Sequence, residues 1–225
     1  MWLVTRVRNG FPTLGSRQVL PGILLAAWLA AIQSWSSLTA AAQARPAEVE
    51  ASRSSPEATT GVVDLDGRER SPFEDSSARA VVLIFISIDC PVSNRYAPEI
   101  QRLQRQFSKL GVAFWLIQPS VDETPEKTRQ HLKRFGYSID LLRDPRHALV
   151  GMAGARITPE VAVFAPGAKL VYHGRIDDRQ ADDLRTRPAP TKHELRDALE
   201  ALLAGRLISV TNAPAVGCRI PRLPP

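Results

Sequence analysis

Cysteine is scarce in this chain, since only two of its 225 residues are cysteines. A scaffold held together by many disulfides is therefore excluded. The sequence also lacks an internal repeat, a glycine-rich phosphate-binding loop and a nucleic-acid-binding motif. Its hydrophobic content of 44% excludes a wholly disordered chain, and its length allows one or two domains with a buried core.

Basic residues outnumber acidic ones, and the formal net charge is +6 with an isoelectric point near 9.8. Three of the positive charges, Arg6, Arg8 and Arg17, lie in the first 18 residues without an acidic neighbour. The rest of the chain carries about +3, which is an ordinary charge for solubility. The basic character therefore comes mainly from the N-terminal segment.

That N-terminal segment has the order of a secretory signal peptide. After the basic stretch, 14 mostly apolar residues run from Val19 to Ile32, and Ala42-Gln43-Ala44 forms a cleavage site. The apolar run is shorter than the roughly 20 residues of a spanning helix, so an uncleaved anchor is the alternative. We expect a signal peptide over 1–44, a mature protein that begins at Arg45, and a periplasmic or secreted location.

The mature chain divides into three parts. Residues 45–60 are rich in Ala, Glu, Ser and Pro without an apolar period, which predicts a flexible linker. Residues 61–205 carry strand-like and helix-like segments and form the predicted domain. The tail, 206–225, has four prolines and little periodicity, and it contains the second cysteine.

Two runs of apolar and β-branched residues, 81–88 and 112–117, predict central strands buried on both faces. Between them, apolar residues at helical spacing predict a helix that ends at Gly111. That stripe consists of Tyr96, Ile100, Leu103, Phe107 and Leu110. Thr124-Pro125 predicts the start of a second helix.

The later part of the domain predicts a hairpin and a final helix. Residues 161–164 and 170–173 are short strands joined by Pro166-Gly167. Thr191 and Glu194 have the spacing of a capping box at the start of the last helix. The order of elements predicts an α/β fold with a mixed central sheet flanked by helices.

Cys90 stands where the first predicted strand meets the first predicted helix. The positive end of the helix dipole and the unpaired N–H groups there favour a thiolate. Asp89 has the opposite effect, because a neighbouring carboxylate disfavours a second negative charge. From its position alone, Cys90 is either a reactive thiol or a buried, inert one.

The residues around Cys90 resemble the active-site segment of the thioredoxin superfamily. In that segment the first cysteine begins a helix, and an Ala-Pro pair follows, as Cys90-Pro-Val-Ser93 and Ala97-Pro98 do here. Thr158-Pro159 resembles the cis-proline site that packs against the active-site cysteine. The resemblance covers about residues 61–205 and implies a thioredoxin-like fold.

Within the superfamily, the chain is most similar to bacterial redoxin-domain proteins, which are grouped with alkyl hydroperoxide reductase C and thiol-specific antioxidant proteins. The segments that carry this similarity are Asp89–Ile100, Thr158–Glu160, Gly174–Asp177 and Gly217-Cys218. The resemblance implies an exported thiol–disulfide oxidoreductase with Cys90 as nucleophile. Its expected partners are protein thiols or disulfides, or a peroxide; it implies no cofactor, and a membrane only through an uncleaved leader.

The departures from the thioredoxin pattern are informative. Ser93 stands where thioredoxins carry their second cysteine, and Ile84 stands where they bury an acid. Cys218 is then the other thiol of the chain that could resolve a mixed disulfide or a sulfenic acid on Cys90. We expect a labile Cys90–Cys218 disulfide.

Three alternatives remain open. A thiol peroxidase would use Ser87 and Arg156 in the places of a peroxiredoxin hydroxyl and arginine, although Leu83 replaces the proline of that signature. A non-catalytic binding module would keep the two cysteines as a structural bridge. A copper carrier is the weakest alternative, because Asn94 stands where the second thiolate would be. The four histidines have no metal-ligand spacing, so no metal site is expected.

Overall fold

The structure is a computed structural model that describes residues 61–182 and 185–223. The predicted signal peptide, 1–44, and the predicted linker, 45–60, lie outside the described residues. Within the described part, no helix combines the length and apolarity that crossing a membrane requires.

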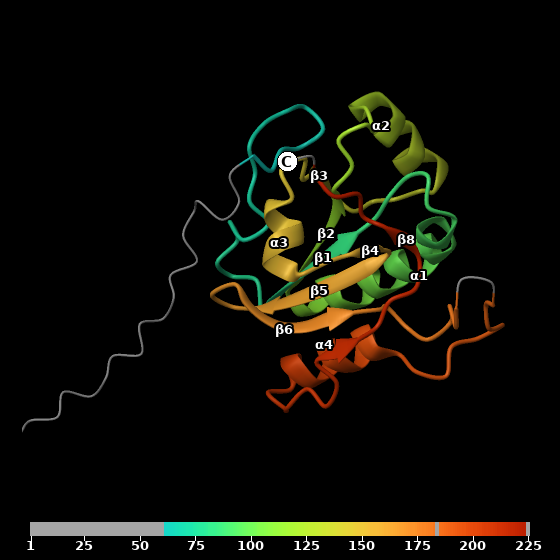
Figure 1. The fold of residues 1–225 in the computed structure, drawn as a ribbon. Coiled ribbons are helices and arrows are strands. Elements are labelled where there is room, and N and C mark those ends of the chain that lie inside the picture. Colours follow the sequence, from blue (N-terminus) through green and yellow to red (C-terminus); the bar gives the residue numbers. More distant parts are fainter. Residues whose placement is uncertain (1–60, 183–184, 224–225) are drawn as a thin grey trace, which may run out of the picture. The chain divides into compact units, whose positions relative to one another are not determined.

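A six-stranded mixed sheet, in the order β3-β2-β1-β5-β6-β7, forms the centre of the domain (Figure 1). β1, β2 and β3 run parallel, β5 runs antiparallel to both β1 and β6, and β7 runs parallel to β6. The strands are β1 (Ala80–Phe85), β2 (Val112–Gln118), β3 (Leu141–Arg143), β5 (Glu160–Ala165), β6 (Lys169–Gly174) and β7 (Asn212–Ala213). All six residues of β1 are buried, as expected for a central strand covered on both faces.

Helices cover the two faces of the sheet. They are α1 (Pro91–Phe107), followed by the short 3₁₀ helix η2 (Ser108–Leu110), then α2 (Pro125–Arg134), α3 (Ala148–Ala153) and α4 (Glu194–Leu203). Val82 and Ile84 of β1 belong to the core cluster that contains α1 and α4, whereas Leu83 and Phe85 belong to the cluster that contains α3. Figure 1 shows α3 on one side of the sheet and α1 on the other. This arrangement confirms the predicted thioredoxin-like α/β class with a mixed sheet.

Most predicted elements occur in the structure. Thr124 is the N-cap of α2 and accepts a hydrogen bond from the Lys127 N–H, and β5 and β6 form the expected hairpin. The apolar stripe of α1 is buried except at its end. Leu110 is the last residue of η2, outside α1, and is 47% exposed, so its predicted burial is wrong.

The last helix begins differently from the prediction. Its N-cap is His193, which makes no capping hydrogen bond with its side chain. The Thr191 hydroxyl instead donates to the Asp178 carboxylate at 2.6 Å, and Glu194 pairs with Arg175. The predicted capping box is therefore wrong, because both side chains bind the chain that follows β6.

The C-terminal tail, for which the sequence predicted little regular structure, packs against the domain. β7 extends the main sheet beside β6. A second strand of the tail, β8 (Cys218–Arg219), pairs antiparallel with β4 (Ile157–Thr158) to form a separate two-stranded sheet. Figure 1 shows this red segment passing beside β4 and the helix α1.

Candidate active site around Cys90

The end of β1 and the start of α1 position Cys90. Its backbone N–H donates to the Ser87 carbonyl oxygen at 3.2 Å. Cys90 is the N-cap of α1, and its sulfur accepts a hydrogen bond from the Ser93 N–H at 3.5 Å. Pro91 follows at the first helical position, where its missing N–H costs nothing. The junction predicted from the sequence is therefore present, and its cysteine is only 1% exposed.

Thr158, the residue before Pro159, contacts this cysteine from a distant part of the sequence. The Thr158–Pro159 peptide bond is cis, as the sequence predicted. The Cys90 thiol donates to the Thr158 carbonyl oxygen at 3.0 Å, across a separation of 68 residues. The contact is buried, since Thr158 is 2% exposed.

Cys218 reaches the same place from the tail. It stands opposite Thr158 in the β4–β8 pair, and the Thr158 hydroxyl donates to its carbonyl oxygen at 3.3 Å. Gly217 makes the close approach possible, because a Cβ there would lie 2.1 Å from the Thr158 carbonyl oxygen. The Cys218 side chain is hydrogen-bonded to Cys90. The structure thus brings together four of the predicted site residues, Cys90, Thr158, Pro159 and Cys218, and it places Ser93 one helical turn away.

The electrostatics around Cys90 favour its thiolate. Burial by itself raises the pKa of the thiol, since a charge is poorly solvated there. Hydrogen bonds from the Cys218 side chain and from the Ser93 N–H act in the opposite direction and outweigh burial, so the net pKa of Cys90 is lowered from its ordinary value. Asp89, expected to oppose the thiolate, is exposed, and solvent screens its charge.

The secondary candidates have other partners. The Ser87 hydroxyl donates to the Glu123 carboxylate at 2.9 Å. Arg156 is exposed, and its side chain lines a different pocket beside β8. Its backbone N–H donates to the Glu160 carboxylate at 2.7 Å, which helps to hold β4 in place. Asn94 donates to the Ile88 carbonyl oxygen at 3.2 Å.

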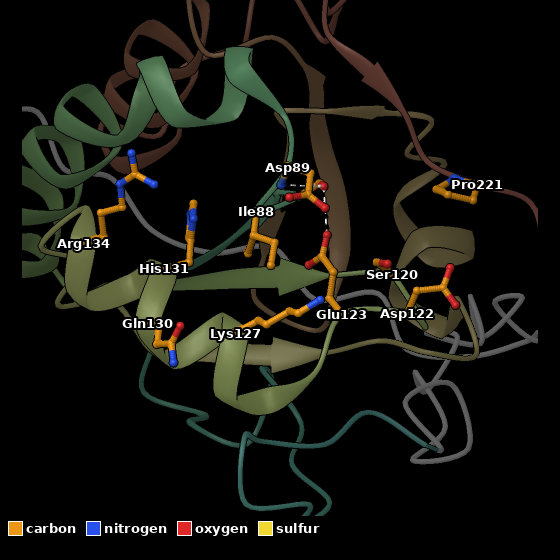
Figure 2. Close-up of a pocket in the computed structure, with 11 residues that line it drawn as sticks. Ile88, Asp89, Ser120, Asp122, Glu123, Lys127, Gln130, His131, Arg134 and Pro221 are labelled. Carbon is orange, nitrogen blue, oxygen red and sulfur yellow. Dashed lines mark hydrogen bonds between the residues drawn. The ribbon is translucent and has the colours of Figure 1, made fainter.

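A polar pocket of about 640 Å³ lies beside the loop that leads into Cys90 (Figure 2). Glu123, from the loop between β2 and α2, is 6% exposed and accepts from both Ser87 and Gln118. Gln118 also donates to Thr128 at 2.8 Å. His131 lines the pocket, and burial, followed by the charge of Arg134, lowers the pKa of its imidazole.

Sequence reasoning missed this polar network and also a contact between Glu160 and His173. Glu160, which follows the cis proline, has a carboxylate oxygen 3.1 Å from Nε2 of His173. Burial acts to raise the pKa of Glu160, but hydrogen bonds from His173 and from the N–H groups of Arg156 and Ile157 lower it overall. A carboxylate next to Pro159 and a Gln at the end of an apolar strand were the available signals. Among residues 61–182 and 185–223, no group of three or more His, Cys, Asp or Glu side chains could hold a metal ion.

Comparison with known proteins identifies the family but not the reaction. Two solved structures are similar: an uncharacterized conserved protein from Geobacillus kaustophilus (27% identity, TM-score 0.62, 73% of this chain and 89% of that chain) and the hypothetical protein SMc02350 from Sinorhizobium meliloti 1021 (26% identity, TM-score 0.60, 71% and 88%). A thioredoxin-like protein from Aeropyrum pernix is 18% identical, with a TM-score of 0.47, over 66% of this chain and 90% of that chain. No curated protein matches. The profile of the AhpC/TSA family matches residues 55–173, and the chain belongs to this family.

Proposed function

We propose that this protein is a thiol–disulfide oxidoreductase whose redox centre is the pair Cys90 and Cys218. The observation that carries the proposal is the contact that both cysteines share with Thr158. The Cys90 sulfur lies 3.0 Å from the Thr158 carbonyl oxygen, and Cys218 stands opposite Thr158 in the β4–β8 pair. Cys90 contributes the stabilised thiolate, and Thr158 holds both cysteines. Ser93 supplies a backbone donor to the sulfur and is not a redox group.

The chemistry requires two sulfurs that interconvert between a dithiol and a disulfide. One cysteine of the pair attacks a partner disulfide as a thiolate, forms a mixed disulfide and releases the first partner sulfur as a thiolate. The other cysteine then attacks its neighbour's sulfur in the mixed disulfide, which closes the intramolecular disulfide and releases the second partner sulfur as a thiolate. The pair then carries two electrons fewer, and the partner disulfide has been reduced. Running in reverse, the same steps oxidise a partner dithiol.

Two of the alternatives are less well supported. A peroxidase needs a hydroxyl and an arginine directed at the nucleophilic sulfur, whereas Ser87 donates to Glu123 and Arg156 lines a separate pocket. A purely structural bridge would give no reason for hydrogen bonds that stabilise the Cys90 thiolate, because a disulfide sulfur carries no charge.

The proposal includes export, with cleavage after Ala44. Two cysteines that alternate between redox states need a compartment in which a disulfide persists. Mass analysis of the exported protein should give Arg45 as the first residue. Intact Met1 in the membrane fraction would instead indicate an uncleaved anchor.

Redox titration of the purified mature protein tests the central claim. After oxidation, non-reducing peptide mapping should find a Cys90–Cys218 disulfide. In thiol–disulfide buffers this bond should be reduced at a potential above roughly −300 mV, which separates labile from structural bridges. Cys90→Ser and Cys218→Ser should each abolish catalysed exchange with a disulfide substrate. A bridge that resists reduction, or two cysteines that stay reduced under oxidising conditions, would contradict the proposal.

A further inference from the structure

The two sulfurs of the proposed redox pair differ in how a partner could reach them. Cys90 is 1% exposed and lies beneath the β4–β8 pair, in the larger core cluster. Cys218 is partly exposed and lies on the strand that forms the outside of that pair. Thiol–disulfide exchange needs direct approach of one sulfur to another, so access decides which sulfur is attacked.

The chemistry of the leaving group points to the same sulfur. In the oxidised pair, attack on Cys218 expels Cys90, and attack on Cys90 expels Cys218. The thiol with the lower pKa leaves faster, and the N–H of Ser93 stabilises the Cys90 thiolate. Attack on Cys218 is therefore favoured by access and by the departure of Cys90.

We propose that partner thiols and disulfides exchange with the sulfur of Cys218 and that Cys90 remains the internal partner beneath β8. This inference rests on the proposed redox pair and assigns which of its sulfurs meets the partner. A reactive cysteine at the start of a helix is ordinarily the one that reacts with the partner. In this protein, Cys90 lies beneath the tail strand β8, and the partner reacts with Cys218 instead.

A partner thiolate attacks the Cys218 sulfur, a new partner–Cys218 bond forms, and the Cys218–Cys90 bond breaks with its electron pair passing to Cys90. A second partner thiolate then attacks the partner sulfur of this mixed disulfide. Cys218 leaves as a thiolate and takes a proton from water. The partner dithiol has lost two electrons, and the pair has gained them.

Trapping of the mixed disulfide tests the assignment in the full mature protein. The oxidised protein is mixed with mercaptoethanesulfonate, quenched rapidly with excess N-ethylmaleimide and mapped by mass spectrometry. We expect the probe on Cys218 and maleimide on Cys90, in at least tenfold excess over the opposite pattern. Probe on Cys90 would overturn the inference while leaving the redox pair intact. Maleimide on both cysteines before the probe is added would instead show that the redox pair itself does not form.

A substitution at Gly217 tests directly whether β8 shields the Cys90 sulfur. Gly217→Ala places a Cβ 2.1 Å from the Thr158 carbonyl oxygen and should push β8 away from β4. Alkylation of Cys90 in the reduced protein should then become several-fold faster. Gly151→Ala in α3 is the control, since a Cβ there meets open space. A second measurement compares the two cysteines of the wild-type protein, so it does not require that Gly217→Ala folds. If Cys90 is alkylated as fast as Cys218 there, β8 does not shield Cys90.

Discussion

The thiol of Cys90 donates a hydrogen bond to the carbonyl oxygen of Thr158, at 3.0 Å and within the buried core. Thr158 also stands opposite Cys218 in the β4–β8 pair. One residue thus contacts both cysteines, although they lie at opposite ends of the domain sequence. Substitutions that loosen β4 or β8 should therefore change the reactivity of the Cys90 thiol, even where the substituted residue does not contact Cys90.

Removal of the Cys218 side chain should raise the pKa of Cys90. Hydrogen bonds to charged groups contribute about 1.5–3 kcal/mol, and 1.4 kcal/mol corresponds to tenfold in an equilibrium. Cys218→Ala should therefore lower the thiolate fraction of Cys90 at neutral pH by roughly tenfold. Ultraviolet absorbance of the thiolate against pH measures this change. In the control Asp89→Ala the pKa should fall slightly, because an exposed negative charge has been removed; an unchanged pKa in Cys218→Ala would contradict the prediction.

Loss of Glu160 should loosen β4. Its carboxylate accepts the N–H groups of Arg156 and Ile157 and pairs with His173. Glu160→Ala leaves these groups without their partner and should cost about 2–3 kcal/mol of unfolding free energy. Denaturant unfolding measures the loss. Glu160→Gln should recover part of it, since its amide oxygen can still accept from the two N–H groups; equal stability of the alanine variant and the wild type would count against this role.

Asp178 should contribute to stability in a pH-dependent way. Burial acts to raise the pKa of its carboxyl, but hydrogen bonds from Thr191 and Lys192 and the charge of Arg187 hold it well below its ordinary value of 3.8. The stabilisation is therefore present above this ordinary value and is lost as the pH falls through the lower pKa of the folded state.

Asp178→Asn should accordingly cost about 2–3 kcal/mol at neutral pH. Its difference from the wild type should shrink as the pH falls below 3.8, which urea unfolding at a series of pH values would measure. Asp197→Asn is the control, because its exposed pair with Arg196 should be worth less than about 1 kcal/mol. A cost for Asp178→Asn that stays constant across this range would contradict the mechanism.

Ser87→Ala separates the oxidoreductase from a peroxidase. The Ser87 hydroxyl donates to the Glu123 carboxylate, and its loss should cost about 1.5–3 kcal/mol of stability. The rate at which peroxide oxidises Cys90 to a sulfenic acid should change less than about threefold, since no hydrogen bond to the reacting sulfur is lost. Mass spectrometry after trapping of the sulfenic acid measures this rate. A drop of a hundredfold would favour the peroxidase.

Local pattern in the sequence was enough to predict the α/β fold class and the junction of strand and helix at Cys90, through a continuous apolar run and the helical spacing of apolar residues. The cis bond before Pro159 was implied by the resemblance of Thr158-Pro159 to the thioredoxin cis-proline site. Local reasoning failed at Thr191, where the buried carboxylate of Asp178, 13 residues earlier, binds the hydroxyl. It also failed at Leu110, whose exposure depends on how one helix ends.

The pairing of the C-terminal tail and the contacts between polar side chains became visible only in the folded chain. The pairing of β8 with β4 joins two-residue strands 60 positions apart, too short to show an apolar alternation in the sequence. The contacts of Glu123 with Ser87 and of Glu160 with His173 likewise join residues from different strands and loops. Such contacts depend on the approach of distant backbone segments, which local propensity does not encode. The sequence therefore identified Cys90 as the candidate nucleophile, whereas its burial beneath the strand of Cys218 is a property of the folded chain.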